Sequence, residues 1–432
     1  MDLWNFGNRQ TIAYNVLPSI VHPAKMKSAL PKILVVTSFP PDAPGGSAWL
    51  LYQLLRGVPS DRVAWWSSSG EAPPHSVERV GSFKSGQLPS RLVPHRRYTQ
   101  IKAFLLELIW VPLAARSLRA YIKDQNPDLL WILAYSWSIP VLHRAVRGLG
   151  IPWHITVHDL ADSKGLVASL GAKRAARFQQ MVDDLYTGAV SRDVYMKETG
   201  EEMERTTGAK ADLIIRCGAE PEEIESIRIK TFPPRQEKIR IGYPGTIIAE
   251  DTFARFIAAL QLIRAEVPVE VNLFGIHSYR DRPWYDHTLI VEHGYLSEEE
   301  FDSRYGNCNW GLAIMELDDS NPRYSRFTFP CKFTRSLASG LPVIAIGHPD
   351  CTLTRFAGQY QLGPVITSSE PREIADALQA ALLKPSDASL LRSEMLRCVN
   401  TEFNAELNRK NLHELFRRGA AEQHSKHQIL TS

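Results

Sequence analysis

Cysteine is scarce in this chain of 432 residues, and the five cysteines form no closely spaced pair. An odd, scattered set without a C-x-x-C motif fits reduced thiols in a cytoplasmic protein. The same pattern argues against a disulfide framework and against a zinc site built on cysteine. No cluster of His and Asp with metal-ligand spacing is present either, so we expect no metal and no cofactor. The cysteines are Cys217, Cys308, Cys331, Cys351 and Cys398.

The sequence also lacks a long apolar run and an excess of one charge. A bilayer-spanning helix needs about 20 apolar residues, and the most apolar stretch, residues 103–115, contains Glu107. Lys and Arg together number 50 and Asp and Glu 47, a near balance that argues against a dedicated nucleic-acid-binding protein. Residues 1–30 lack the basic start and unbroken apolar core of a signal peptide and are predicted to be a tail.

Residues 91–116 allow two interpretations. Arg91, His95, Arg96 and Arg97 directly precede the apolar stretch. A basic segment beside an apolar helix can lie on a membrane surface, which predicts a peripheral contact at the inner face of the membrane. The alternative is a core helix that follows a solvated loop.

Short apolar runs and helical patterns alternate along most of the chain. Hydrophobic residues make up 44% of the sequence, enough for large cores, and the length suggests two domains. The run KILVVT (32–37) is typical of a buried parallel strand, and a Pro- and Gly-rich loop and a helical pattern follow it. The alternation begins again after IKTFPPRQEK, which is predicted to be a linker.

We therefore predict an α/β fold of two Rossmann-like, doubly wound parallel-sheet domains that face each other across a cleft. The predicted divisions are a tail (1–30), a first domain (31–228), a linker (229–238), a second domain (239–386), and a C-terminal helix and tail (387–432) that packs at the back and returns to the first domain. The predicted strands cover 32–37, 62–66, 129–133, 153–157, 188–190 and 213–216, then 240–243, 269–274, 289–293, 311–315 and 342–346.

Ligands of open parallel sheets bind beyond the carboxyl ends of the strands, and two segments of the first domain fall there. Gly45 and Gly46 open the first helix, where glycines admit a ligand and leave amides free, although the spacing is not G-x-G-x-x-G. His158 and Asp159 follow the strand WHITV, and His158 can act as acid, base or hydrogen-bond donor to a sugar. The plainer interpretation is that Asp159 caps the next turn and His158 only packs.

The second domain offers a glycine turn and a cluster of cations. Lys332 and Arg335 lie in the first turns of a helix that begins near Pro330. A helix start carries partial positive charge and disfavours cations, so two cations there indicate a bound anion such as a diphosphate. The plainer interpretation is that these side chains and those of the preceding loop reach into solvent. The predicted donor-binding residues are Gly245, Thr246, Arg323, Arg326, Lys332 and Arg335.

Several of these segments together resemble the retaining glycosyltransferases of the GT-B fold, in particular family four. The resemblance covers most of residues 32–383 and is most specific in SLASGLPVIA. It implies transfer of a sugar, with retention, from a nucleotide-sugar donor held in residues 240–350 to a saccharide or lipid-linked acceptor that enters past the first glycine loop. The histidine of the cleft would bond to the transferred sugar. The segments are KILVVTSFPPDAPGGSAWLLYQLL, TVHDL, AVSRDVYMKETG, GYPGTI, VEHGYLSEEEF and FPCKFTRSLASGLPVIA.

The chain departs from the family pattern on the donor side. Members usually carry two glutamates eight positions apart before the A-S-G segment, and Phe327 and Arg335 stand there. An Arg and a Lys usually follow the glycine turn, where Thr246 and Asp251 stand. Pro330 and Lys332 match a proline-x-lysine variant of some relatives. Two alternatives to an active transferase therefore stay open: a degenerate GT-B protein that serves as a binding or scaffold subunit, and a nucleotide-sugar epimerase of the same fold.

Overall fold

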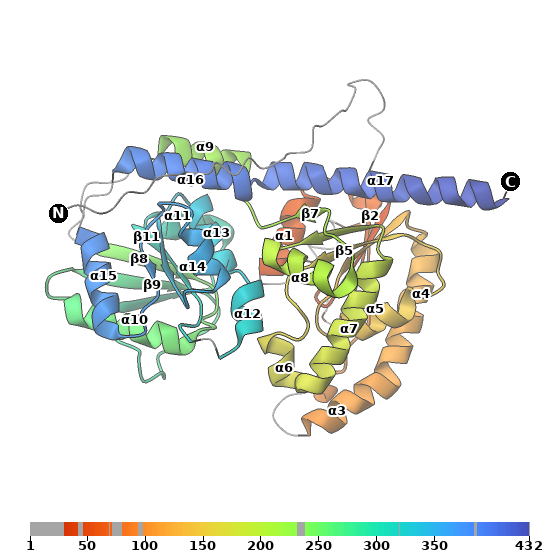
Figure 1. Ribbon diagram of the computed structural model, residues 1–432, viewed down its shortest axis with the longest axis horizontal. Coiled ribbons are helices and arrows are strands. Elements are labelled where there is room, and N and C mark those ends of the chain that lie inside the picture. The colour runs from red at the N-terminus through yellow and green to blue at the C-terminus, as the bar shows by residue number, and fades with distance from the viewer. Residues whose placement is uncertain are drawn as a thin grey trace, which may run out of the picture.

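Two parallel β-sheets, each flanked by helices, lie side by side in the protein (Figure 1). The computed structural model describes residues 30–41, 46–68, 70, 80–93, 98–230, 238–318, 320–383 and 387–431. The predicted α/β class with two doubly wound parallel-sheet domains is confirmed. Gly45, His95, Arg96 and Arg97 lie outside the described residues, as does almost all of the predicted tail.

The first sheet has seven strands in the order β3-β2-β1-β4-β5-β6-β7, and every neighbouring pair is parallel. The strands are β1 (Ile33–Thr37), β2 (Val63–Ser67), β3 (Ser82–Ser85), β4 (Leu129–Leu133), β5 (Trp153–Val157), β6 (Ser191–Val194) and β7 (Leu213–Ile214).

The second sheet has six strands in the order β10-β9-β8-β11-β12-β13, again with parallel neighbours. The strands are β8 (Ile239–Pro244), β9 (Val269–Phe274), β10 (Ile290–Gly294), β11 (Trp310–Ile314), β12 (Val343–Ile346) and β13 (Val365–Ile366).

Helices connect the strands and cover both faces of the sheets. Those of the first domain are α1 (Gly46–Leu55), α3 (Thr99–Leu105), α4 (Val111–Gln125), α5 (Ser138–Ala145), α6 (Lys164–Leu170), α7 (Ala172–Gly188) and α8 (Lys197–Thr207). Helix α9 (Pro221–Ile229) comes next in the chain and packs against α13 and α16 beside the second domain (Figure 1). Those of the second domain and the C-terminal segment are α10 (Glu250–Ile263), α11 (Glu298–Gly306), α12 (Pro322–Phe327), α13 (Cys331–Ala338), α14 (Thr352–Ala357), α15 (Pro371–Leu383), α16 (Ala388–Glu402) and α17 (Ala405–Thr431). Short helical turns cover Ser60–Arg62, Ser90–Leu92 and Leu106–Trp110.

Strand β1 is almost entirely apolar because both of its faces are buried. Ile33 and Val35 belong to one hydrophobic core, and Leu34 and Val36 belong to the core on the other face of the sheet. All four side chains are fully buried. Successive strand residues point to opposite faces, so a strand covered by helices on both sides is mostly apolar. The one polar residue of β1, the buried Thr37, has hydrogen-bond partners: its hydroxyl donates to Phe39 O and accepts from Trp65 Nε1.

The strand orders place the ligand-binding edge of each domain. The order reverses between β1 and β4 in the first sheet and between β8 and β11 in the second. In parallel α/β sheets, such a reversal opens a crevice at the carboxyl ends of the strands. The first helix α1, the turn after β8 and the helices that follow β11 all begin at these crevices.

The C-terminal segment forms two helices where one helical stretch is predicted. Helix α16 packs against α9 and α13, and α17 packs against α1 and the first sheet (Figure 1). Between them the chain passes beside the crossover from the first domain: Ala219 donates its amide to Phe403 O at 2.7 Å, and the amide of Ala405 donates to Ala219 O at 3.1 Å. The chain thus crosses between the two domains twice, near Ala219 and near Phe403, and the two crossings are hydrogen-bonded to each other.

Local predictions differ in their outcome. A capping box, which the S-x-x-E pattern of the sequence predicts, begins α11: Ser297 Oγ accepts from the amide of Glu300 at 3.3 Å. The predicted strand at 188–190 is wrong, because α7 continues to Gly188 and β6 begins only at Ser191. A Cβ on Gly188 would lie 2.7 Å from the Trp153 ring, so the glycine is a packing requirement of the helix end. Strands β3 and β13, both short edge strands, are not predicted.

Candidate active site at the domain interface

His158 lies at the carboxyl end of β5 and is almost completely buried. Its Nδ1 lies 3.0 Å from Ser47 Oγ, in the first turn of α1. Its Nε2 is buried and has no hydrogen-bond partner among the described residues. The Tyr195 ring packs edge-on against the imidazole, with the ring centres 5.5 Å apart. The imidazole is therefore held in place from one side and leaves one nitrogen for a ligand.

Burial lowers the pKa of His158, while Asp193 and Asp159 act in the opposite direction. The ring is therefore neutral near pH 7, and each of its nitrogens has a distinct role. When Ser47 donates to Nδ1, Nε2 carries the hydrogen and becomes a donor. A neutral donor in a dry site suits a sugar hydroxyl or a developing negative charge.

Asp159 connects the two domains. Thr328, which ends α12 in the second domain, donates its hydroxyl to Asp159 Oδ1 at 2.8 Å. Burial raises the pKa of Asp159, and the hydrogen bond from Thr328 and the neighbouring His158 oppose that shift. The carboxyl group thus fixes the position of one domain against the other beside His158.

Lys332 and the glycine turn after β8 lie together, although the sequence separates them widely. A Cβ placed on Gly245 would lie 3.9 Å from Lys332 Cε and 4.0 Å from Nζ. The Lys332 ammonium lies 5.2 Å from the centre of the Tyr243 ring. Gly245 has φ +82°, a left-handed conformation that glycine adopts without strain. Tyr243 donates its hydroxyl to Thr246 O at 3.4 Å, which ties the turn to the strand.

The electrostatics of Lys332 indicate an anion site. Burial lowers its pKa, and no carboxylate pairs with it among the residues that the structure describes. Lys332 is partly buried, and a cation that has lost part of its hydration is favoured by a nearby counter-charge. Lys332 also stands in the first turn of α13, where free amides favour an anion. A phosphate beside Gly245 would meet both the ammonium group and the helix start.

Gly46 brings the first helix against the start of α13. A Cβ on Gly46 would lie 2.6 Å from Cys331 Sγ, so only glycine allows this approach. Cys217 donates its thiol to Gly46 O at 3.5 Å, and the Tyr195 hydroxyl lies 3.4 Å from Cys331 Sγ. The Cys217 thiol lowers the pKa of Cys331 to about 7, with Tyr195 and Lys332 acting in the same direction and burial against it.

The other predicted cations are placed differently. Arg335 pairs with Asp302 and, at 3.5 Å, with Glu223, and its guanidinium packs against the Phe301 ring. Arg323 forms ion pairs across the interface, with Asp162 at 3.0 Å and Glu202 at 2.9 Å. Both are therefore committed to protein carboxylates and leave Lys332 as the cation beside the turn.

The remaining predicted residues lie at the surface. Arg326 on α12 and Thr246 in the glycine turn are both exposed. Gly46 is described and Gly45 is not, so only half of the predicted acceptor-side glycine pair is placed.

No group of three or more His, Cys, Asp or Glu side chains that could hold a metal occurs within the described ranges.

Four residues of the site are absent from the sequence-based prediction. They are Ser47, Tyr195, Tyr243 and Thr328, which contact His158, Cys331, Lys332 and Asp159. Ser47 directly follows the glycine pair, and its hydroxyl at a helix start is a local signal. The other three lie far along the chain from their partners, and nothing in their own neighbourhoods indicates the contacts.

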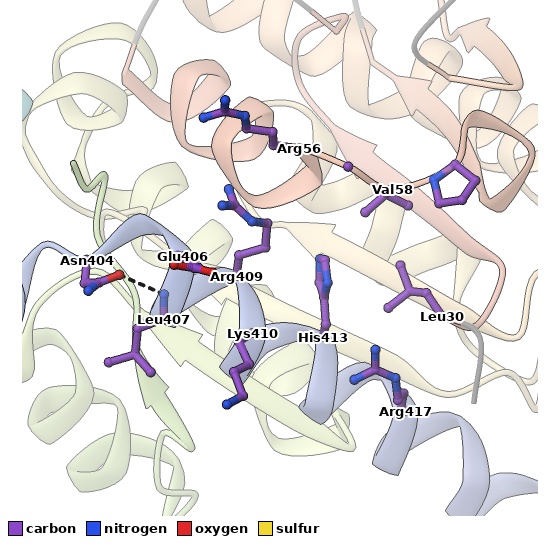
Figure 2. Close-up of a pocket in the computed structure, with 12 residues that line it drawn as sticks. Leu30, Arg56, Val58, Asn404, Glu406, Leu407, Arg409, Lys410, His413 and Arg417 are labelled. Carbon is purple, nitrogen blue, oxygen red and sulfur yellow. Dashed lines mark hydrogen bonds between the residues drawn. The ribbon is translucent and has the colours of Figure 1, made fainter. Parts of the chain in front are cut away.

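A separate cavity of about 750 Å³ opens between α17 and the end of α1 (Figure 2). Arg56 and Arg409 line it, and both pair with Glu220, at 3.2 and 3.0 Å. The two arginines thus share one carboxylate of the protein. The cavity lies at the opposite end of α1 from Gly46, so it is not part of the interface site.

Comparison with known protein families and with curated protein sequences finds no match. Comparison with solved structures finds many. Sucrose-phosphate synthase from Thermosynechococcus elongatus superposes with a TM-score of 0.64 at 18% identity, over 90% of this chain and 100% of that one. The Anabaena protein HepE, in complex with UDP and glucose, gives 0.61 at 12% identity, over 89% and 98%. Trehalose-6-phosphate synthase from E. coli, bound with UDP-2-fluoro glucose, gives 0.59 at 14% identity, over 89% and 99%.

These likenesses extend over both domains and cover nearly the whole of each compared chain. At such low identity they define the fold, which is the two-domain GT-B fold that the sequence motifs predicted. A fold hosts many functions, so the function of this chain depends on the residues of its site.

Proposed function

We propose that the protein is a glycosyltransferase that moves a sugar from a nucleotide-diphosphate sugar to a saccharide or lipid-linked acceptor. The observation that carries the proposal is the placement of Lys332: a partly buried ammonium group at a helix start, next to the Gly245 turn, that pairs with no carboxylate of the described residues. That arrangement matches the paired phosphates of a sugar nucleotide. Two of the similar solved structures hold UDP or a UDP-sugar, which makes UDP the first candidate carrier.

In this proposal the residues of the interface divide the work. Lys332, Gly245 and the start of α13 hold the diphosphate and neutralise the charge that develops as it leaves. His158 Nε2 donates to the transferred sugar, and Ser47 keeps the ring oriented. The acceptor enters on the α1 side past Gly46. Rate acceleration would then come from positioning and from charge stabilisation, and transfer with retention fits the family resemblance.

A non-catalytic scaffold is the second candidate, and one observation favours it. Arg335 occupies a position where the related family usually has a glutamate, and it fills that space with ion pairs to Asp302 and Glu223. A carboxylate that such enzymes would use in donor binding is thereby replaced. A scaffold would keep the fold and lose the sugar nucleotide.

Isothermal titration with UDP, GDP and a panel of their sugars separates these candidates. A transferase binds at least one nucleotide and releases free nucleoside diphosphate only when an acceptor is present. A scaffold binds none of them. An epimerase would instead isomerise the bound sugar without an acceptor, which NMR of the product mixture detects.

We further propose a cytoplasmic location, in keeping with the five unpaired cysteines, and a peripheral membrane contact through residues 91–116. Such a contact would bring a lipid-linked acceptor within reach of the enzyme.

A further inference from the structure

The helix from Thr99 to Gln125, formed by α3, a wide turn at Leu106–Trp110 and α4, is apolar on two opposite faces. One face is buried in the first domain and includes Ala103, Leu106, Trp110, Ala114 and Leu118. The other face carries five large apolar side chains that are each more than half exposed, and Tyr98, directly before the helix, adds a sixth. They are Tyr98, Ile101, Phe104, Leu108, Ile109 and Leu113, and we call them the α3–α4 face.

The wide turn has a local cause. Pro112 has no amide hydrogen, so the carbonyl four residues before it loses its helical partner. The amide of Val111 instead donates to Leu106 O, one residue further back than in a regular helix. Turns of this kind occur often at functional sites. Here the turn leaves Leu108 and Ile109 both exposed, and this joins the apolar residues of α3 to those of α4.

Cations border the α3–α4 face. Lys102 stands one helical turn after Tyr98, and Arg116 stands one turn after Leu113. Neither forms an ion pair with any residue that the structure describes. Glu107, the only acidic residue from 91 to 123, is covered by Arg174 at 2.7 Å and by Arg177. The border of the face is therefore positively charged.

We infer that the α3–α4 face docks on an anionic lipid bilayer. Large apolar side chains that project from one helix face can enter the acyl region, while the surrounding Lys and Arg meet lipid phosphates. A second copy of this chain fits less well. A symmetric dimer through this face would bring identical cations together without the carboxylates to balance them. No described helix has both the length and the apolar composition to cross a bilayer, so the contact is peripheral.

The face is connected to the segment after His158 through α6. Gln100 on α3 donates to Leu170 O at 3.1 Å, at the end of α6, and α3 and α6 lie together at the edge of the first domain (Figure 1). Helix α6 begins six residues after His158. The inference deepens the proposed function and rests on it for one step only: docking by this face would present a lipid-linked acceptor to the histidine.

The test is binding of the full chain to vesicles. Phosphatidylcholine vesicles containing phosphatidylglycerol should bind the protein, and vesicles of phosphatidylcholine alone should bind it roughly tenfold more weakly, because the border cations lose their counter-charge. Phe104→Asp combined with Leu108→Asp should lower binding by more than about tenfold. Lys102→Gln should lower it about fivefold. Leu262→Asp, at an equally exposed leucine of the second domain, is the matched control and should bind like the wild type.

Three outcomes would overturn the inference. The first is that the wild type does not bind anionic vesicles. The second is that the double variant binds them like the wild type. The third is that the only effect of the double variant is to dissociate a dimer seen by light scattering. UDP affinity keeps this test separate from the proposed function. The double variant should bind UDP like the wild type, because its substitutions lie on the outer face of the helix. Vesicle binding without any UDP binding would remove the transferase proposal and leave the docking face intact.

Discussion

The ammonium group of Lys332 lies 5.2 Å from the centre of the Tyr243 ring, at the place where the second sheet reverses its strand order. The aromatic ring stabilises the cation without neutralising it. An incoming diphosphate therefore finds a charge that pairs with no carboxylate in the described part of the chain. This relationship makes Lys332 the most informative residue to change.

Lys332→Ala should weaken UDP binding roughly 30-fold or more, about 2 kcal/mol, because it removes the partly buried cation that would pair with the diphosphate and leaves that anion unmatched. Isothermal titration measures the change. Lys238→Ala is the control, since Lys238 belongs to the same domain and pairs with Glu270 at 2.7 Å on the outside. Equal UDP affinity in both variants would discard the phosphate site.

His158→Ala should lower turnover roughly 100-fold while UDP affinity stays close to the wild-type value, because the histidine acts on the sugar and not on the diphosphate. Ser47→Ala should give a smaller loss, since it frees the ring at Nδ1 without removing Nε2. Steady-state kinetics and titration on the same preparations separate the two effects. Wild-type turnover in His158→Ala would make the residue a packing element of the core.

The sequence allowed the sheets to be predicted well because their strands are buried on both faces. The uninterrupted apolar run of β4 and the aromatic and β-branched run of β5, which includes His154 and Thr156, both favour a strand at that length, and both strands match their predicted bounds. The strands missed were β3, with the polar sequence SFKS, and β13, with two residues. A polar strand and a strand of two residues carry little apolar pattern, so periodicity does not reveal them, whereas the edge strands β7 and β10 are predicted.

The site was predictable in parts and not in its contacts. Lys332 and Gly245 each carried a local signal, a cation at a helix start and a glycine after a strand. Their proximity depends on β8 and β11 being neighbours in the sheet. The pairing of Arg335 with Glu223 involves residues 112 positions apart, and no local pattern can report it. Local chemistry indicates candidates, while tertiary neighbours decide which of them remain available to a ligand.

Gly46→Ala should disturb the contact between the domains, because its Cβ would lie 2.6 Å from Cys331 Sγ. We expect a loss of about 1–3 kcal/mol in the free energy of unfolding, the usual cost of overpacking, and a lower turnover. Cys331→Ala in the same chain removes the clashing sulfur and should restore most of the loss. Denaturant unfolding and kinetics give both readouts.

Gly306→Ala is the matched control for that variant. Gly306 ends α11, and a Cβ there meets nothing within 4 Å. Stability should be equal or slightly greater, since alanine favours a helix over glycine by up to about 1 kcal/mol. If the variant that combines Gly46→Ala with Cys331→Ala is no more stable than Gly46→Ala alone, the Cys331 sulfur is not the obstacle.

His413 makes the stability of the α1–α17 contact depend on pH. Its Nε2 donates to Leu54 O at 2.9 Å, and burial, with Arg417 and Arg409 nearby, lowers its pKa below the ordinary value of 6.5 (Figure 2). Below about pH 6.5 the unfolded chain binds a proton that the folded chain refuses, so the free energy of unfolding falls as pH falls. The loss is at most about 1.4 kcal/mol per pH unit for this group and ends once pH passes below the folded pKa. Above pH 6.5 the group contributes no pH dependence.

His413→Gln should therefore flatten the acid side of the stability profile, because glutamine can still donate to Leu54 O and does not titrate. Urea unfolding of both proteins at pH values from about 7.5 to 5 measures the difference, and that difference isolates His413 from the other titrating groups. His277→Gln, at an exposed histidine, should follow the wild-type curve. Parallel profiles for wild type and His413→Gln would mean that the folded chain accepts the proton at this position as readily as the unfolded chain does, and that the α1–α17 contact is indifferent to the charge of the ring.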